Sequence, residues 1–130
     1  MSLSKKIFNI SNEDEFNSTA LEVFNFQYKN VPIYKSYVDL LKIENDKLSS
    51  YKEIPFLPVH FFKEHNLISN NLTVEKIFLS SGTTQKKRSK HLVHSIKLYE
   101  KSFNLGFEYF YGNPNEWTIL ALLPSYLEQG

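Results

Sequence analysis

A short run of small hydroxyl residues around a glycine is the part of this sequence best suited to chemistry. Ser80-Ser81-Gly82-Thr83-Thr84 supplies four hydroxyls, and Gly82 allows consecutive backbone N–H groups to converge on one anion. Basic side chains, which pair with anionic oxygens, follow at Lys86, Lys87, Arg88 and Lys90. From the residues alone, we expect a phosphorylated or carboxylated ligand to bind this loop.

Two ordinary explanations compete with an anion site. A Ser/Gly/Thr cluster between two strands is typical of a hairpin turn, and a basic run is often a solvated loop. The run also lacks the Gly-Lys-Ser/Thr of a Walker loop and the spaced glycines of a dinucleotide fingerprint. The combination of a preceding strand, a hydroxyl–glycine loop and four cations favours the anion site.

Four histidines are the other candidate ligands. His60 and His65 lie five residues apart, and His91 and His94 lie three apart. No cysteine or carboxylate accompanies them at metal-ligand spacing, so no metal site is predicted.

The elements that must position the loop begin with two helices. One is predicted over Asn12–Tyr28, because Asn12 can cap its first turn and Glu15 stands three residues later, as a capping box requires. A second is predicted to start at Pro32. Their apolar stripes at helical spacing are Phe16, Ala20, Val23 and Phe24, then Tyr34, Tyr37, Val38 and Leu41.

Strands and a further helix are predicted after an extended connector. The prolines of Ile54–Pro58 exclude helix there, and this connector brings His60–Lys63 against the core. The predicted strands are Val74–Leu79, His91–Val93 and Trp117–Leu123, and the helix is Ser95–Tyr111, stopped by Gly112. We expect this helix to pack on a sheet of the first and last strands through Ile96, Tyr99, Phe103 and Phe107.

This order of elements predicts an α/β fold. Residues 1–50 are expected to be helical and residues 51–130 to be α/β, together forming one partial domain over 1–130. The strand Trp117–Leu123 has no covering helix after it, whereas parallel sheets are covered on both faces. We therefore expect either a missing continuation or a second copy of the chain against the unfinished sheet, as in a homo-oligomer.

Composition narrows the class of protein. Of the 130 residues, 42% are hydrophobic and the formal net charge is +1, which predicts a globular domain without a field that draws it to nucleic acid or membrane. There is no cysteine, which excludes disulfides and thiol catalysis for this chain. No apolar run approaches the roughly 20 residues of a membrane helix and no signal-peptide core is present, so a cytoplasmic location is expected.

The segment Phe78–Thr84 resembles the phosphate-binding signature of the adenylate-forming superfamily, which includes acyl-CoA synthetases and phenylacetate–CoA ligases. A wider set of segments is similar to the acyl-protein synthetase family of bacterial bioluminescence and its non-luminous relatives. In chain order these segments are Ile54–Pro58, Phe61-Phe62-Lys63, the hydroxyl–glycine loop, Ser89-Lys90-His91 and Leu122–Glu128. The similarity covers residues 50–130, and the helices before them carry no signature.

The resemblance implies a ligase that uses ATP and Mg²⁺ to activate a fatty or aromatic carboxylic acid as an acyl-adenylate. The acyl group then passes to a thiol, either of coenzyme A or of a protein cysteine outside this chain. Nucleotide phosphates are assigned by the resemblance to Ser80, Ser81, Gly82, Thr83 and Thr84, with Arg88 or Lys90 as the loop cation. Tyr126 falls where relatives place an aromatic residue or a histidine near the acyl pocket.

The chain departs from the family at Gln85, where relatives carry glycine and where a side chain disfavours positive φ. The family's Mg²⁺-binding acid, ribose-binding Asp, mobile Lys and acceptor Cys have no counterpart before Gly130. We therefore expect these residues to be the amino-terminal part of a longer enzyme and to be inactive alone. The alternative is a non-catalytic module whose basic hairpin loop, residues 80–91, binds anions or nucleic acid. Nucleic acid is the less expected ligand, because the cations occupy one short loop.

Overall fold

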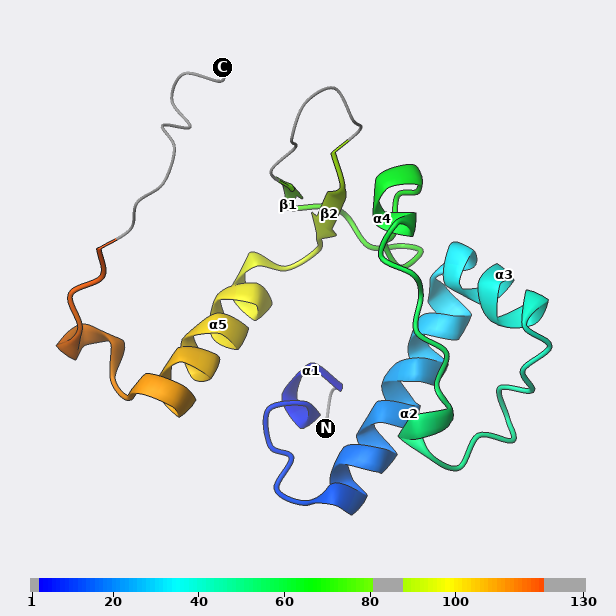
Figure 1. The fold of residues 1–130 in the computed structure, drawn as a ribbon, viewed down its shortest axis with the longest axis horizontal. Helices are drawn as coiled ribbons and strands as arrows, with labels where there is room; N and C mark the ends of the chain where they lie inside the picture. The colour runs from blue at the N-terminus through cyan, green and yellow to red at the C-terminus, as the bar shows by residue number, and fades with distance from the viewer. Residues whose placement is uncertain (1–2, 81–87, 121–130) are drawn as a thin grey trace. The chain divides into compact units, whose positions relative to one another are not determined.

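The chain forms two compact units, Met1–Ile96 and Lys97–Gly130, in a computed structural model that describes residues 3–80 and 88–120. The elements of the first unit are α1 (Leu3–Lys6), α2 (Glu13–Asn30), α3 (Pro32–Leu40), the 3-10 turn η1 (Tyr51–Glu53), α4 (Phe61–Glu64), β1 (Lys76–Leu79) and β2 (Lys90–Val93) (Figure 1). The second unit contains α5 (Ile96–Tyr111), whose first residue belongs to the first unit, and the 3-10 turn η2 (Pro114–Glu116).

Helix α2 begins where its sequence predicts. The Asn12 side-chain oxygen accepts from the Glu15 backbone N–H at 2.9 Å, which satisfies one free donor of the first turn. The reciprocal half of the predicted capping box is displaced by one residue. The Glu15 carboxylate accepts from the N–H and hydroxyl of Ser11, each at 2.9 Å, rather than from Asn12. These two hydrogen bonds lower the pKa of Glu15, the backbone N–H having the larger effect.

The core of the first unit lies between α2 and α3. Phe24, Tyr34 and Val38 are 3%, 6% and 0% exposed. Pro32 occupies the first turn of α3, as predicted, because its fixed φ suits a helix start. Partly buried side chains that pack against these three are Tyr28, Val31, Tyr37, Ile43, Leu48, Ile54 and Leu57.

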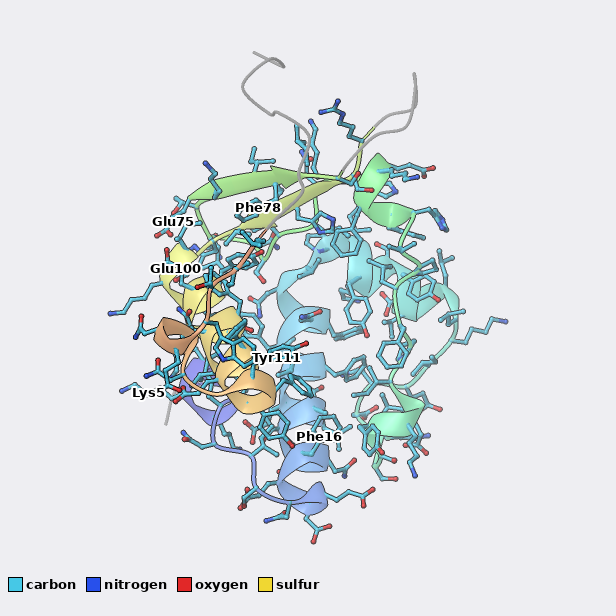
Figure 2. The ribbon with its side chains drawn as sticks, turned by 60° about the vertical axis from the view of Figure 1, so that its left-hand side comes forward. Lys5, Phe16, Glu75, Phe78, Glu100 and Tyr111 are labelled. Carbon is cyan, nitrogen blue, oxygen red and sulfur yellow. The ribbon has the colours of Figure 1, made fainter. Side chains whose placement is uncertain are left out.

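The connector Ile54–Pro58 contains no helix, as its prolines predict, and the 3-10 turn η1 that precedes it is fixed to α2. Ser50 and Glu53 form a capping box around η1. The Asn17 side chain on α2 accepts from the Tyr51 N–H at 2.7 Å and donates to the Ser49 carbonyl at 3.0 Å. The Phe16 ring, which projects from α2 in Figure 2, meets the Tyr51 ring edge-on with centroids 5.0 Å apart.

The only sheet in the described ranges is a two-stranded antiparallel hairpin, so the observed class is mixed α+β. Strands β1 and β2 confirm the predictions at Val74–Leu79 and His91–Val93, with β1 two residues shorter at its start. The predicted strand at Trp117–Leu123 is wrong as far as it can be followed. Residues 117–120 follow η2 without strand pairing, and residues 121–123 lie outside the described ranges.

Helix α5 confirms the prediction over Ser95–Tyr111. At its start, the Ile96 N–H donates to the Glu75 carboxylate at 2.7 Å, and at its end Gly112 adopts a φ of 81° that favours glycine. Glu75 lies just before β1 (Figure 2). The expected covering of Phe103 is wrong, because this side chain is 52% exposed. An amphipathic pattern fixes which side chains share a face, but it does not supply the surface that covers them.

Candidate functional site

The β1–β2 hairpin carries the residues that flank the predicted anion loop. Its register pairs Leu79 with Lys90 and Phe78 with His91. Beyond the last strand pair, the Ser80 N–H donates to the Ser89 carbonyl at 3.0 Å, and the Ser89 N–H donates to the Ser80 hydroxyl oxygen, also at 3.0 Å. Ser80 and Ser89 therefore close the two ends of the connection that runs from residue 81 to residue 88.

This closure leaves the Ser80 hydroxyl able to donate. A serine hydroxyl carries one proton and two lone pairs, and the Ser89 N–H occupies a lone pair only. Ser89 is 7% exposed, so the closing pair is partly buried at the base of the loop.

The structure describes three of the predicted site residues, namely Ser80, Arg88 and Lys90. Arg88 is exposed and lies on the loop side of the Ser80–Ser89 pair, whereas Lys90 is exposed and lies within β2. The two candidate cations therefore lie in different places, Arg88 beside the loop and Lys90 within strand β2. The predicted site residues outside the described ranges are Ser81, Gly82, Thr83, Thr84 and Tyr126, together with Gln85.

A second cation, not assigned to the site from the sequence, lies near Lys90. Helix α4 packs beside β2, where the Phe62 ring stacks on the His91 ring with centroids 5.0 Å apart and an interplanar angle of 24°. A small cavity of about 220 Å³ there is lined by Phe62, Lys63, Glu64, His65, Asn66 and Lys90. The Phe61-Phe62-Lys63 segment was part of the resemblance, but only the packing of α4 on β2 places Lys63 beside Lys90.

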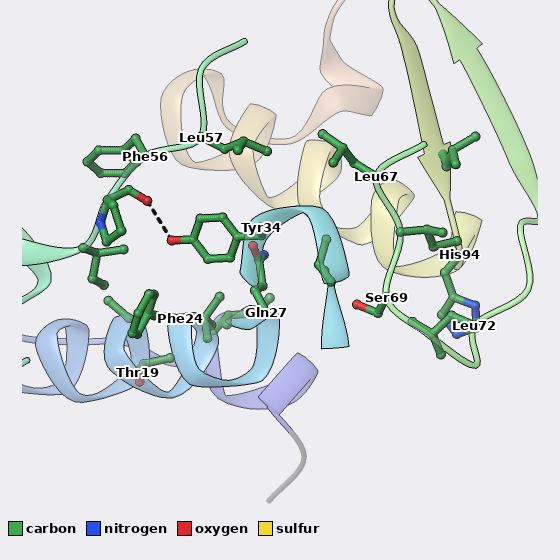
Figure 3. Close-up of a pocket in the computed structure, with 18 of the residues that line it drawn as sticks. Thr19, Phe24, Gln27, Tyr34, Phe56, Leu57, Leu67, Ser69, Leu72 and His94 are labelled. Atoms are coloured by element: carbon green, nitrogen blue, oxygen red, sulfur yellow. Dashed lines mark hydrogen bonds between the residues drawn. The ribbon is translucent and has the colours of Figure 1, made fainter. Parts of the chain in front are cut away.

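A larger cavity, of about 770 Å³, lies in the same unit. We call it the apolar cavity. Its walls come from α2, α3, the connector, α4, the segment 67–72 and β2, together with Ile7, Ile10 and His94 (Figure 3). All four residues of the apolar stripe predicted for α2 contribute to this lining. They are Phe16, Ala20, Val23 and Phe24. This apolar face of α2 therefore borders an open volume as well as the core.

Few polar groups border the apolar cavity. The Tyr34 hydroxyl donates to the Pro55 carbonyl at 2.7 Å (Figure 3), and burial raises the pKa of Tyr34 to about 12, with a smaller contribution from Tyr37. At the other side, His94 Nδ1 lies 2.9 Å from the Thr73 carbonyl oxygen. Thr19, Gln27 and Ser69 are the remaining polar residues of the lining.

Metal binding has no support among the residues that the structure describes, where no group of three His, Cys, Asp or Glu side chains could hold an ion. The histidines instead contact aromatic rings or backbone. His60 and His65 each lie against the Phe61 ring, at 4.8 Å and 5.4 Å. In the same residues, no helix is long and apolar enough to cross a membrane.

Comparisons with family models, with curated proteins and with solved structures found no match.

Proposed function

We propose that this chain forms the nucleotide-phosphate part of an enzyme that activates a carboxylic acid with ATP and Mg²⁺, as an acyl-adenylate, and transfers the acyl group to a thiol. The proposal includes the finer fold prediction, in which the observed helices and hairpin open a larger adenylate-forming domain. The thiol belongs to coenzyme A or to a protein cysteine outside this chain, which has none.

One observation carries the proposal. The signature-like run begins at Ser80, directly after β1, and the chain returns through Ser89 into β2, so the hydroxyl–glycine residues form the connection of a closed hairpin. Phosphate binding by backbone needs converging N–H groups, and the hydrogen bonds between Ser80 and Ser89 hold together the two ends of this connection. Lys63 beside the hairpin and Lys90 on β2 add positive charge for phosphate oxygens.

The chain's residues have distinct parts in this proposal. Ser80, Ser81, Gly82, Thr83 and Thr84 hold the β- and γ-phosphates through N–H and hydroxyl donors. Arg88 or Lys90 neutralises charge that develops on the phosphates. ATP supplies the adenylyl group, and Mg²⁺, held by residues outside this chain, neutralises its phosphates.

Acid-dependent exchange of pyrophosphate into ATP tests the proposal in the full-length enzyme that it requires. We expect exchange with a member of a panel of fatty and aromatic acids, and its loss in Gly82→Val, because the added side chain blocks close backbone approach. Gln85→Gly is the matched control in the same loop and should keep or raise exchange. Absence of exchange with every acid, together with unchanged ligand affinity in Gly82→Val, would contradict the proposal.

A non-catalytic module that binds single-stranded nucleic acid is the second candidate. The stacked Phe62 and His91 rings beside Lys90 favour it, because bases stack on aromatic side chains near cations. Binding of an oligonucleotide that weakens in Phe62→Ala, in a protein without pyrophosphate exchange, would favour the module over the enzyme.

A further inference from the structure

Two lysines from distant segments share the small cavity. Lys63 on α4 and Lys90 on β2 both line this volume of about 220 Å³. Both residues are exposed, so a ligand from solvent can reach them. Two ammonium groups beside one small volume repel each other, and an anion between them offsets this repulsion. The cavity therefore favours an anionic ligand.

A ring stack brings the two lysines together. Phe62 precedes Lys63 in α4, and His91 follows Lys90 in β2. The two rings stack with centroids 5.0 Å apart and an interplanar angle of 24°. Helix α4 spans only Phe61–Glu64, and a helix of one turn is unstable without tertiary packing. The stack on His91 therefore helps to fix where Lys63 lies relative to Lys90.

The lysine pair lies beside the base of the predicted anion loop. Lys90 comes directly after Ser89, whose N–H and carbonyl are hydrogen-bonded to Ser80. Lys90 also pairs with Leu79, the last residue of β1. A ligand with two linked phosphoryl groups can therefore put one group in the loop and the other beside Lys90.

The other polar residues of the lining modify the charge of the small cavity. Glu64 contributes one negative charge against the two positive charges of the lysines. His65 and Asn66 also line the cavity, and the Asn66 amide can donate hydrogen bonds to an anion. The cavity is therefore positive overall, and Glu64 opposes the binding of an anion there.

We infer that Lys63 is a phosphate-binding residue outside the loop, and that the stack of Phe62 on His91 positions it beside Lys90. The lysine pair binds one phosphoryl group while the loop binds the next, so the site selects linked phosphates over a single phosphate. This inference rests on the proposed function, in which the loop holds the phosphates of ATP. Phe62 and His91 are positioning residues, because they act through Lys63 and Lys90.

Titrations of the 130-residue chain with pyrophosphate, Mg²⁺–ATP and orthophosphate test the role of Lys63. Lys63→Gln should weaken pyrophosphate binding at least about tenfold, the loss of one charge-assisted hydrogen bond. Orthophosphate needs only the loop, so its affinity should fall by less than about twofold. Lys29→Gln, at an exposed residue of α2, is the matched control and should change neither affinity. A matching loss for Mg²⁺–ATP assigns the lysine pair to the nucleotide, and a loss for pyrophosphate alone assigns it to the released product.

A double-mutant cycle tests whether Phe62 acts through Lys63. Phe62→Ala should weaken pyrophosphate binding about fivefold or more in the native chain, and should add little when Lys63→Gln is already present. Phe62→Tyr keeps the ring and should keep the affinity. A purely structural role for Phe62 predicts the same loss with and without Lys63, and Lys63→Gln alone tests the binding residue if Phe62→Ala does not fold.

Glu64 provides a test of opposite sign. Glu64→Gln removes the negative charge of the cavity and should strengthen pyrophosphate binding by about twofold to fivefold, with a smaller gain at high salt. Glu44→Gln, at an exposed residue outside the lining, is the matched control and should have no effect.

Three results would overturn the inference. These are an unchanged affinity in Lys63→Gln, an equal loss for orthophosphate and pyrophosphate, or an equal loss from Phe62→Ala in both backgrounds. Pyrophosphate binding that Gly82→Val abolishes and Lys63→Gln leaves unchanged would remove the inference and leave the proposed function standing. Binding that Lys63→Gln weakens and Gly82→Val leaves unchanged would do the reverse.

Discussion

At the scale of single residues, Tyr34 joins the helical core to the connector. Its hydroxyl is the donor to the Pro55 carbonyl, so Tyr34→Phe leaves that carbonyl without this partner. We expect the free energy of unfolding to fall by about 1 kcal/mol, the usual net worth of such a hydrogen bond. Urea unfolding measures this change, and Tyr109→Phe, at a side chain 84% exposed, should have no effect.

The same residue gives stability a pH dependence. Burial raises the pKa of Tyr34 from 10.0 to about 12, so the unfolded chain releases this proton first. The stabilisation is therefore complete below pH 10 and is lost as the pH rises through 12. Unfolding free energies measured across this window should fall more steeply in the native chain than in Tyr34→Phe. Equal slopes would contradict the assignment.

At the scale of elements, the start of α2 depends on one side-chain cap. Asn12→Ala removes the acceptor of the Glu15 N–H and should lower the free energy of unfolding by about 1 kcal/mol. Asn104→Ala, an exposed position within α5, makes the same chemical change where alanine favours helix, so it should be neutral or slightly stabilising. Thermal unfolding of both variants distinguishes the two effects. Equal losses would show that the cap is not the cause.

Packing of α2 on α3 is the next interaction to test. Phe24 is 3% exposed and meets the Tyr34 ring edge-on at 6.1 Å, so Phe24→Ala should cost about 3–5 kcal/mol of unfolding free energy. Phe110→Ala removes the same group from a side chain 75% exposed and should cost little. A small loss at Phe24 would mean that the helix pair is not the core.

Local signals in the sequence predicted these elements, but they did not predict the contacts between segments distant in the chain. Each successful signal acts within about one turn of the chain. The structure confirms the element boundaries predicted from Asn12, Pro32, the connector prolines and Gly112. The proximity of Lys63 to Lys90 depends on α4 packing beside β2, which no spacing reveals. The prediction of a strand starting at Trp117 was wrong because an apolar run does not specify the strand with which it pairs.

At the scale of the whole molecule, exposed aromatic side chains on α5 predict self-association. Tyr109, Phe110 and Tyr111 are each exposed near the end of α5, and large exposed apolar side chains are common in contact surfaces. Sedimentation velocity should show a mass that rises with concentration in the native chain. The double substitution Tyr109→Ser and Phe110→Ser should reduce this rise, whereas Val59→Ser, also exposed, should not. A monomer at all concentrations would contradict the prediction.

The most direct measurement of the central claim is a titration of the chain with Mg²⁺–ATP and with pyrophosphate, followed through backbone amide NMR signals. We expect shifts concentrated at Ser80–Thr84 and Arg88–Lys90, and their loss in Gly82→Val. Arg88→Ala and Lys90→Ala should each weaken binding, by about 1.5–3 kcal/mol for a charge-assisted hydrogen bond. The variant with the larger loss identifies the loop cation. Shifts confined to other segments, or none at these residues with either ligand, would contradict a nucleotide-phosphate site in this hairpin.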